Sequence, residues 1–284
     1  MAWQLAPGRM SQHAFCLSPE GSPELRQVAL RWLDAAPPSD AVWEYYASKQ
    51  ASPDLQTLEM DGGVRFDLDE TRAISSWDPS RMRLDVRLWH PGFERIPEPI
   101  RLEVAYIFLD NLLGQDDVER WIGSIDVLDA RTGGRTPAEL KAEVERRRMA
   151  VRGDETWVMN RIEHADGRLT MIIADASLKR IDHPYADHHV GIGVVLEAGG
   201  MPDDALAAAL NAEEDDLLAR LTGVAIHAAR TTTPGLRTLH FVTEDTERMK
   251  SAIDAWARGL PRRGINVELE RDMGWDFQVL LGIR

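Results

Sequence analysis

The chain has 284 residues, and its formal net charge is −14 at pH 7. The length predicts two domains of ordinary size, and the acidic balance argues against direct binding to nucleic acid or to an anionic membrane, since both require a cationic surface. The single cysteine excludes an intrachain disulfide and a zinc site built from cysteines of one chain, and without a secretory signal pattern or a long apolar run we expect a cytoplasmic protein.

Short periodic segments predict an α+β first domain at residues 1–131. We expect a strand at 13–18 and then a helix that begins at Ser22-Pro23, because serine caps a helix and proline fits its first turn. Pro37-Pro38 ends this helix. Further strands are predicted at 42–47, 55–60, 64–68 and 82–88, with a turn at Asp61-Gly62-Gly63.

The end of the first domain is predicted to be a helix that returns at once into a strand. Apolar residues recur at helical spacing over 104–113, and Gly114 stands where a glycine commonly ends a helix. We expect 118–127 to form a β-favouring run with Gly123 as a bulge. The resulting order, β-α-β-β-α-β with an extra strand or two, is typical of a ferredoxin-like sandwich.

Residues 132–152 are predicted to be a linker that carries one charged helix. Thr136-Pro137-Ala138-Glu139 has the pattern of a capping box and starts this helix, which runs to about Met149. The arginine run 146–148 is expected to be a solvated helix end, favoured by the helix dipole.

The second domain, residues 153–284, begins with a hairpin turned by Asp166-Gly167. Next we expect a buried strand, a long helix that starts after Pro202, a strand pair turned at Pro234-Gly235, a helix and a last strand. Helix and hairpin recur in the order of the first domain. The predicted fold class is therefore α+β, with two ferredoxin-like α/β sandwich domains that have antiparallel sheets.

Several short motifs of the second domain carry a resemblance to a known family. They are Trp157 with Asp166-Gly167, Gly200-Met201-Pro202, Glu214 to Leu218, Arg230 to Gly235, His240-Phe241-Val242 and Asp272 to Trp275. On these residues the C-terminal half resembles the uncharacterised bacterial family called domain of unknown function 695. The first domain looks like the module that often precedes it, through Ala35-Ala36-Pro37, Trp43 and Leu109 to Gly123. The family has no established activity, so the resemblance implies architecture and no catalytic residues.

The densest polar cluster spans residues 182–189. Imidazole and carboxylate groups suit a divalent metal, and the candidate ligands are His183, Asp187, His188 and His189. Pro184 favours a loop, and neighbouring histidines of a strand point to opposite faces. We therefore favour a polar loop that leads into a strand, with a divalent metal site as the alternative and no other cofactor. The acidic run 213–216 is expected to be a solvated helix face.

Two of the nine tryptophans, Trp77 and Trp89, lie near predicted turns and are candidates for anchoring a partner. Most of the others are expected to pack in the core. Cys16 lies in a predicted strand, where we expect a buried thiol rather than a nucleophile.

The preferred hypothesis is a non-catalytic protein-binding or regulatory module whose acidic surface docks on a basic protein, for example a nucleic-acid enzyme or a toxin. The first alternative is a metal-assisted hydrolase built on the cluster from Asp182 to His189, with Glu214 added by conjecture. The second alternative is a structural module that self-associates into homo-oligomers through its sheet edges.

Overall fold

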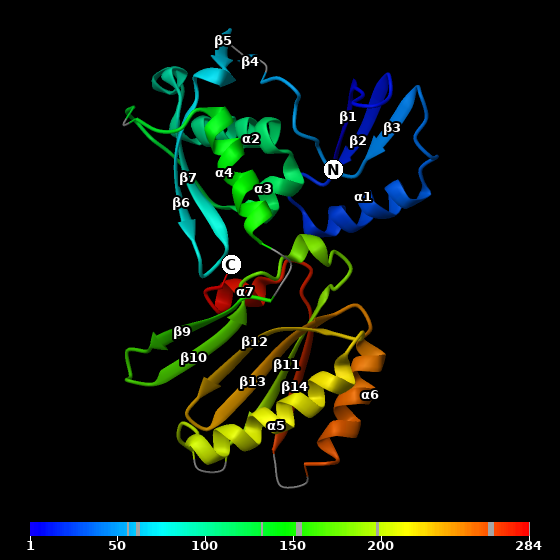
Figure 1. The fold of residues 1–284 in the computed structure, drawn as a ribbon, viewed down its shortest axis with the longest axis vertical. Helices are drawn as coiled ribbons and strands as arrows, with labels where there is room; N and C mark the ends of the chain where they lie inside the picture. Colours follow the sequence, from blue (N-terminus) through cyan, green and yellow to red (C-terminus); the bar gives the residue numbers. More distant parts are fainter. Residues whose placement is uncertain are drawn as a thin grey trace. The chain divides into compact units, whose positions relative to one another are not determined.

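The computed structural model describes residues 1–55, 57–60, 63–131, 133–151, 155–196, 199–260 and 264–283. The chain divides into two compact units, Met1–Asp154 and Glu155–Arg284. Each unit contains helices and sheets, so the predicted mixed α+β class is confirmed (Figure 1). Within the described ranges, no helix is both long and apolar enough to cross a membrane.

The described residues of the first unit form three separate sheets. Its elements are β1 (Ala2–Pro7), β2 (His13–Ser18), α1 (Pro23–Ala35), β3 (Trp43–Tyr46), β4 (Thr57–Met60), β5 (Val64–Asp67), β6 (Arg72–Asp78), β7 (Arg83–Trp89), α2 (Glu98–Leu113), α3 (Gln115–Trp121), β8 (Ile122–Val127) and α4 (Pro137–Ala150). The sheet orders are β1-β2-β3, β4-β5 and β6-β7-β8.

The purely antiparallel pairing that we predicted is wrong for this unit, because β2–β3 and β7–β8 run parallel. In the sequence, α1 connects β2 to β3, and α2 and α3 connect β7 to β8. Each connection returns the chain to the end of the sheet where the first strand began, as parallel strands require. The N-terminus of α1 agrees with the prediction, since the Ser22 hydroxyl accepts a hydrogen bond from the N–H of Leu25 and Pro23 is the first helical residue.

The region 118–127 differs from its predicted strand. Residues Gln115–Trp121 form α3, and only Ile122–Val127 form β8. Val118 and Trp121 are three residues apart, and both contact the same core. This spacing is typical of a helix, whereas we predicted a strand for these residues. The predicted bulge is confirmed, because β8 has one more residue than β7 between Ile122 and Ile125.

Helix α4 belongs to the packing of the first unit. Its capping box between Thr136 and Glu139 is formed as predicted. Leu140 and Val144 are buried in the core formed mainly by α2 and the β6-β7-β8 sheet. The structure thus places this helix in the first unit rather than in a separate linker. The ends of the predicted linker, residues 132 and 152, and Asp61 and Gly62 of the predicted turn lie outside the described residues.

The second unit is built around one six-stranded antiparallel sheet with the order β14-β11-β13-β12-β10-β9. Its elements are β9 (Trp157–Glu163), β10 (Leu169–Asp175), β11 (His188–Val195), α5 (Asp204–Leu221), β12 (Ile226–Thr233), β13 (Leu236–Thr243), α6 (Thr246–Ala257), β14 (Ile265–Arg271) and α7 (Asp276–Leu280). The predicted hairpin is confirmed, with Gly167 at a φ of +80° in its turn.

The two faces of this sheet carry different layers. Helices α5 and α6 cover one face, where they pack on Val190, Ile192 and Phe241, and the β9–β10 hairpin extends beyond them (Figure 1). Trp275 and Phe277, at the start of α7, pack with Ala228 and Val242 in a smaller cluster. Side chains of the central strands therefore alternate between a large apolar layer and a face with several polar groups.

Candidate functional site

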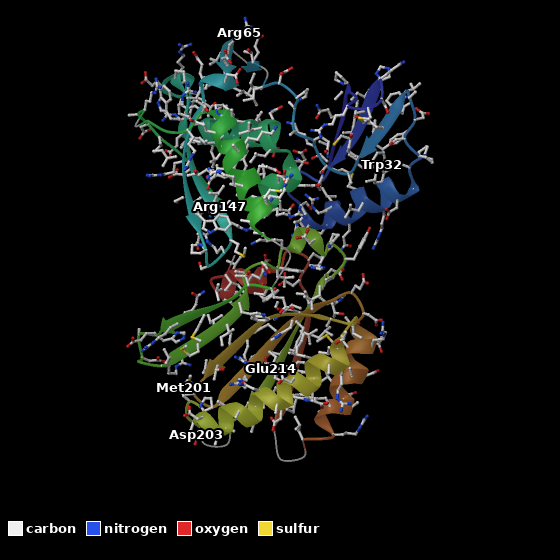
Figure 2. The ribbon with its side chains drawn as sticks, viewed as in Figure 1. Trp32, Arg65, Arg147, Met201, Asp203 and Glu214 are labelled. Atoms are coloured by element: carbon white, nitrogen blue, oxygen red, sulfur yellow. The ribbon has the colours of Figure 1, made fainter. Side chains whose placement is uncertain are left out.

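The buried face of α5 contains one carboxylate, Glu214. The helix buries Leu210, Glu214, Leu217 and Leu221, which recur at the spacing of a single helical stripe. Glu214 is 6% exposed, so its charge is removed from water and requires partners. Figure 2 marks Glu214 on α5 and Asp203 at the N-terminal end of the helix. The Asp203 carboxylate caps the helix by accepting a hydrogen bond from the N–H of Leu206.

The partners of Glu214 come from β12 and β13. Nη1 of Arg230 donates to its carboxylate at 2.8 Å, and Nη1 of Arg237 lies 3.7 Å from the same oxygen. The side-chain oxygen of Asn211, one turn earlier in α5, accepts hydrogen bonds from both arginines at 3.2 and 2.9 Å. Two strands and a helix are thus joined by one charged, hydrogen-bonded network.

A β-bulge in β12 adds His227 to this network. The register between β12 and β13 shifts between His227 and Ala229. One extra residue at that point places His227 and Arg230 on the same face, although residues three apart in a regular strand face opposite sides. Nε2 of His227 lies 3.9 Å from the Glu214 carboxylate and 3.1 Å from the carbonyl oxygen of Ala229.

The network forms one wall of a cavity of about 430 Å³, which we call the Glu214 pocket. Its lining residues are Glu155, Trp157, Ile173, Glu214, Leu218, His227 and Arg230. The Trp157 ring lies 5.0 Å from the His227 ring, and its Nε1–H donates to the Glu155 carboxylate at 2.8 Å. Trp157 is 38% exposed, so the aromatic ring and its carboxylate partner are accessible from solvent.

The charge of the pocket follows from burial. Burial lowers the pKa of His227, and the nearby Glu214 carboxylate opposes this effect only in part. His227 is therefore neutral at pH 7, and Nε2 donates to the Ala229 carbonyl, which can only accept. Arg230 pairs with Glu214. Among the described residues, the other carboxylate of the pocket, Glu155, accepts a hydrogen bond from Trp157 and has no arginine partner. Such a site favours a cation.

The opposite face of the sheet carries a row of polar side chains that crosses four strands, which we call the histidine row. Glu270 of β14 lies 3.1 Å from Nδ1 of His189 in β11. Nε2 of His189 lies 3.1 Å from Nδ1 of His240 in β13. Nε2 of His240 lies 3.2 Å from the hydroxyl of Thr231 in β12. The Phe277 ring stacks on His189 at 4.3 Å.

The histidine row superficially resembles a carboxylate–histidine–hydroxyl relay, but its chemistry is unsuited to base catalysis. Burial, with smaller effects from His189 and His227, lowers the pKa of His240 to about 3. An imidazole with that pKa is a very weak base at pH 7, where efficient general bases have pKa values closer to the working pH. We therefore interpret the row as a hydrogen-bonded structural ladder.

Two of the four predicted metal ligands, Asp187 and His188, contact each other, whereas His183 and His189 lie in other surroundings. His183 stacks on Trp275 with ring centroids 6.3 Å apart, and His189 belongs to the histidine row. Asp187 contacts Nδ1 of His188 at 2.9 Å and is also 3.3 Å from Arg271. Among the described residues, no group of three or more His, Cys, Asp or Glu side chains is arranged to hold a metal ion.

Each of the two predicted partner anchors has an arginine over its ring, and both rings are partly exposed. The guanidinium of Arg147 lies over the Trp77 ring at 4.5 Å, and that of Arg131 lies over Trp89 at 5.7 Å. Trp77 also packs against the first core. These contacts are cation–π interactions within the chain, and a role of either ring in binding a partner stays a prediction.

Sequence reasoning missed most of the Glu214 pocket. The acidic run at 213–216 was expected to be solvated, and that prediction is wrong for Glu214. The missed signal is its position four residues after Leu210 and three before Leu217, which places it on the apolar stripe. Its arginine partners lie 16 and 23 positions later, on two strands. The spacing of residues in the sequence does not by itself predict how those strands pair.

Comparison with protein families gives a match in the C-terminal half. Residues 155–281 match the model of a family described as "Family of unknown function (DUF695)", which confirms the resemblance predicted for the C-terminal half. Comparisons with curated proteins and with solved structures give no match.

Proposed function

We propose that the protein is a non-catalytic binding module that docks on a basic protein partner and accepts a lysine or arginine side chain of that partner in the Glu214 pocket. The observation that carries this proposal is the pair formed by Trp157 and Glu155 at the pocket. A cation over the tryptophan ring gains a cation–π contact, and the adjacent carboxylate adds a charge-assisted hydrogen bond.

The charge of the whole chain supports the same partner. A net charge of −14 steers a basic protein toward the surface and raises the association rate at low ionic strength. On this basis we propose a regulatory role in the bacterial cytoplasm, in which the protein binds a basic protein and covers its cationic surface.

We also propose that the second unit is a ferredoxin-like sandwich extended by one hairpin. Strands β11, β12, β13 and β14 with helices α5 and α6 follow the order β-α-β-β-α-β. Their sheet order, β14-β11-β13-β12, supports this description, and β9–β10 adds two strands beside β12.

Binding of hexa-arginine to the full chain, measured by calorimetry at low salt, tests the pocket. We expect Trp157→Ala to weaken binding about tenfold, because a partly desolvated cation–π contact contributes about 1–2 kcal/mol. Glu155→Gln should also weaken it. Asp216→Asn is the matched control, since it removes one exposed negative charge on the outer face of α5.

Two outcomes would contradict the proposal. If Glu155→Gln and Asp216→Asn weaken binding equally and Trp157→Ala has no effect, the peptide responds to net charge and not to the pocket. If binding is unchanged in about 0.5 M salt, where the screening length is only a few ångströms, electrostatic docking is rejected.

A further inference from the structure

Strand β14 forms one edge of the six-stranded sheet, and its outer backbone groups can be identified from its register. At one end of the pair with β11, the N–H of Val195 donates to the carbonyl of Gly264, and at the other end the N–H of Asp272 donates to the carbonyl of Asp187. Backbone groups alternate in direction along a strand. Those that face away from β11 therefore belong to Ile265, Val267, Leu269 and Arg271.

The side chains of β14 differ between its two faces. Val267 and Leu269 lie on the face that carries α5 and α6, opposite Ile192 and Val190. Each is 48% exposed, so the helices leave this apolar strip partly uncovered. Glu268 lies on the other face with Glu270, which also contacts His189. The edge therefore shows aliphatic and acidic side chains at alternate positions.

A second copy of the chain is a poor occupant for this edge. Antiparallel pairing of two copies centred on the strand sets Glu268 against Glu268, and a shift toward Arg271 sets it against Glu270. A shift toward Ile265 sets it against Asn266 and gains no ion pair. Like charges directly opposite each other destabilise paired strands. Charge complementarity instead favours a partner with basic side chains on that face.

We propose that the outer edge of β14 accepts an extended segment of a partner protein in which basic and apolar residues alternate. The segment adds a seventh strand by backbone hydrogen bonds, places its basic side chains opposite Glu268 and Glu270, and places its apolar side chains beside Val267 and Leu269. This inference rests on the proposed function for the basic nature of the partner, but it uses the sheet edge that lies across the sheet from the Glu214 pocket.

The test compares two synthetic peptides of identical composition, one alternating arginine and valine and one with the arginines and valines in separate blocks. We expect the alternating peptide to bind the full chain about tenfold more tightly. Its binding should slow hydrogen exchange at the N–H groups of Val267 and Leu269. Equal affinities of the two peptides, or unchanged hydrogen-exchange rates at the N–H groups of Val267 and Leu269, would overturn the proposal.

Variants then separate this edge from the pocket. Val267→Pro removes one outward N–H at an edge position that tolerates proline and should reduce the affinity of the alternating peptide to that of the block peptide, which retains binding at the Glu214 pocket. Glu268→Gln, which keeps the strand intact, should weaken it about threefold, whereas Glu163→Gln on the opposite edge strand should not. Full binding by Val267→Pro, or equal effects of the two glutamine variants, contradicts the proposal.

The two proposals fail separately. Trp157→Ala should reduce hexa-arginine binding while the alternating peptide still protects β14. Sedimentation of the unliganded chain gives a further check, since a dimer that Val267→Pro dissociates would show that a second copy occupies the edge and would overturn the inference.

Discussion

Asp110, in the last turn of α2, is a carboxyl group whose surroundings oppose its charge. Burial raises its pKa from an ordinary value of 3.8 to about 6, Glu20 adds to the rise, and Lys49 and Gln115 oppose it. The C-terminal end of a helix is also unfavourable for a negative charge. Because the pKa of Asp110 is raised in the folded state, its contribution to the free energy of unfolding is fully present below about pH 4. This contribution is lost as the pH rises through about 6.

Asp110→Asn should therefore stabilise the first unit at neutral pH. We expect a gain of about 2 kcal/mol in the free energy of unfolding at pH 7.5, which disappears near pH 3, because the aspartate is then largely protonated in both states. Urea unfolding at a series of pH values measures this difference. Asp34→Asn is the control, since Asp34 is exposed in the last turn of α1. A gain that is independent of pH would contradict the assignment to the ionised carboxylate.

At the scale of elements, α4 shows how a segment with a charged sequence is held by a few apolar contacts. Glu143 is buried and pairs with Arg146 and Arg147 of the same helix, and Arg147 also covers Trp77. Leu140 and Val144 insert into the core between these charged residues. A helix that is polar over most of its surface is thus an integral part of the first unit.

Leu140→Ala should destabilise the first unit by about 3 kcal/mol, because Leu140 is 0% exposed and its removal leaves a cavity. Met149→Ala in the same helix is the control, and with Met149 74% exposed it should change stability by less than about 0.5 kcal/mol. Urea unfolding followed by circular dichroism measures both. Equal effects would mean that α4 does not contribute to this core.

At the scale of the whole molecule, the chain consists of two units that each have their own buried clusters. The second unit has a large cluster under α5 and α6 and two smaller clusters around Trp275, Phe277 and Ile283. An independent hydrophobic core is the physical requirement for independent folding.

We predict that residues 155–284, produced alone, fold cooperatively and bind hexa-arginine as the full chain does. A single urea transition with a slope of about 1–3 kcal/mol per molar urea would support this, as would an unchanged affinity. A fragment that remains unfolded, or folds without binding, would show that residues 1–154 contribute to the fold or to the site.

Local chemistry in the sequence determined several element boundaries. The cap at Ser22, the capping box at Thr136 and Glu139, and the hairpin turn at Gly167 each depend on residues within three or four positions of one another. Such interactions form in the same way whatever surrounds them. The buried state of Cys16 was predicted correctly for a related reason, since apolar neighbours in a strand indicate a buried face.

Only the tertiary structure decided which distant segments meet. The parallel pairs of the first unit, the burial of Glu214 by Arg230 and Arg237, and the histidine row across four strands all join residues that are far apart in the chain. Their geometry depends on strand register, and a shift of one residue moves every side chain to the other face. For strands that no hairpin turn connects, register is set by the packing of the whole sheet, so no local pattern in the sequence determines it.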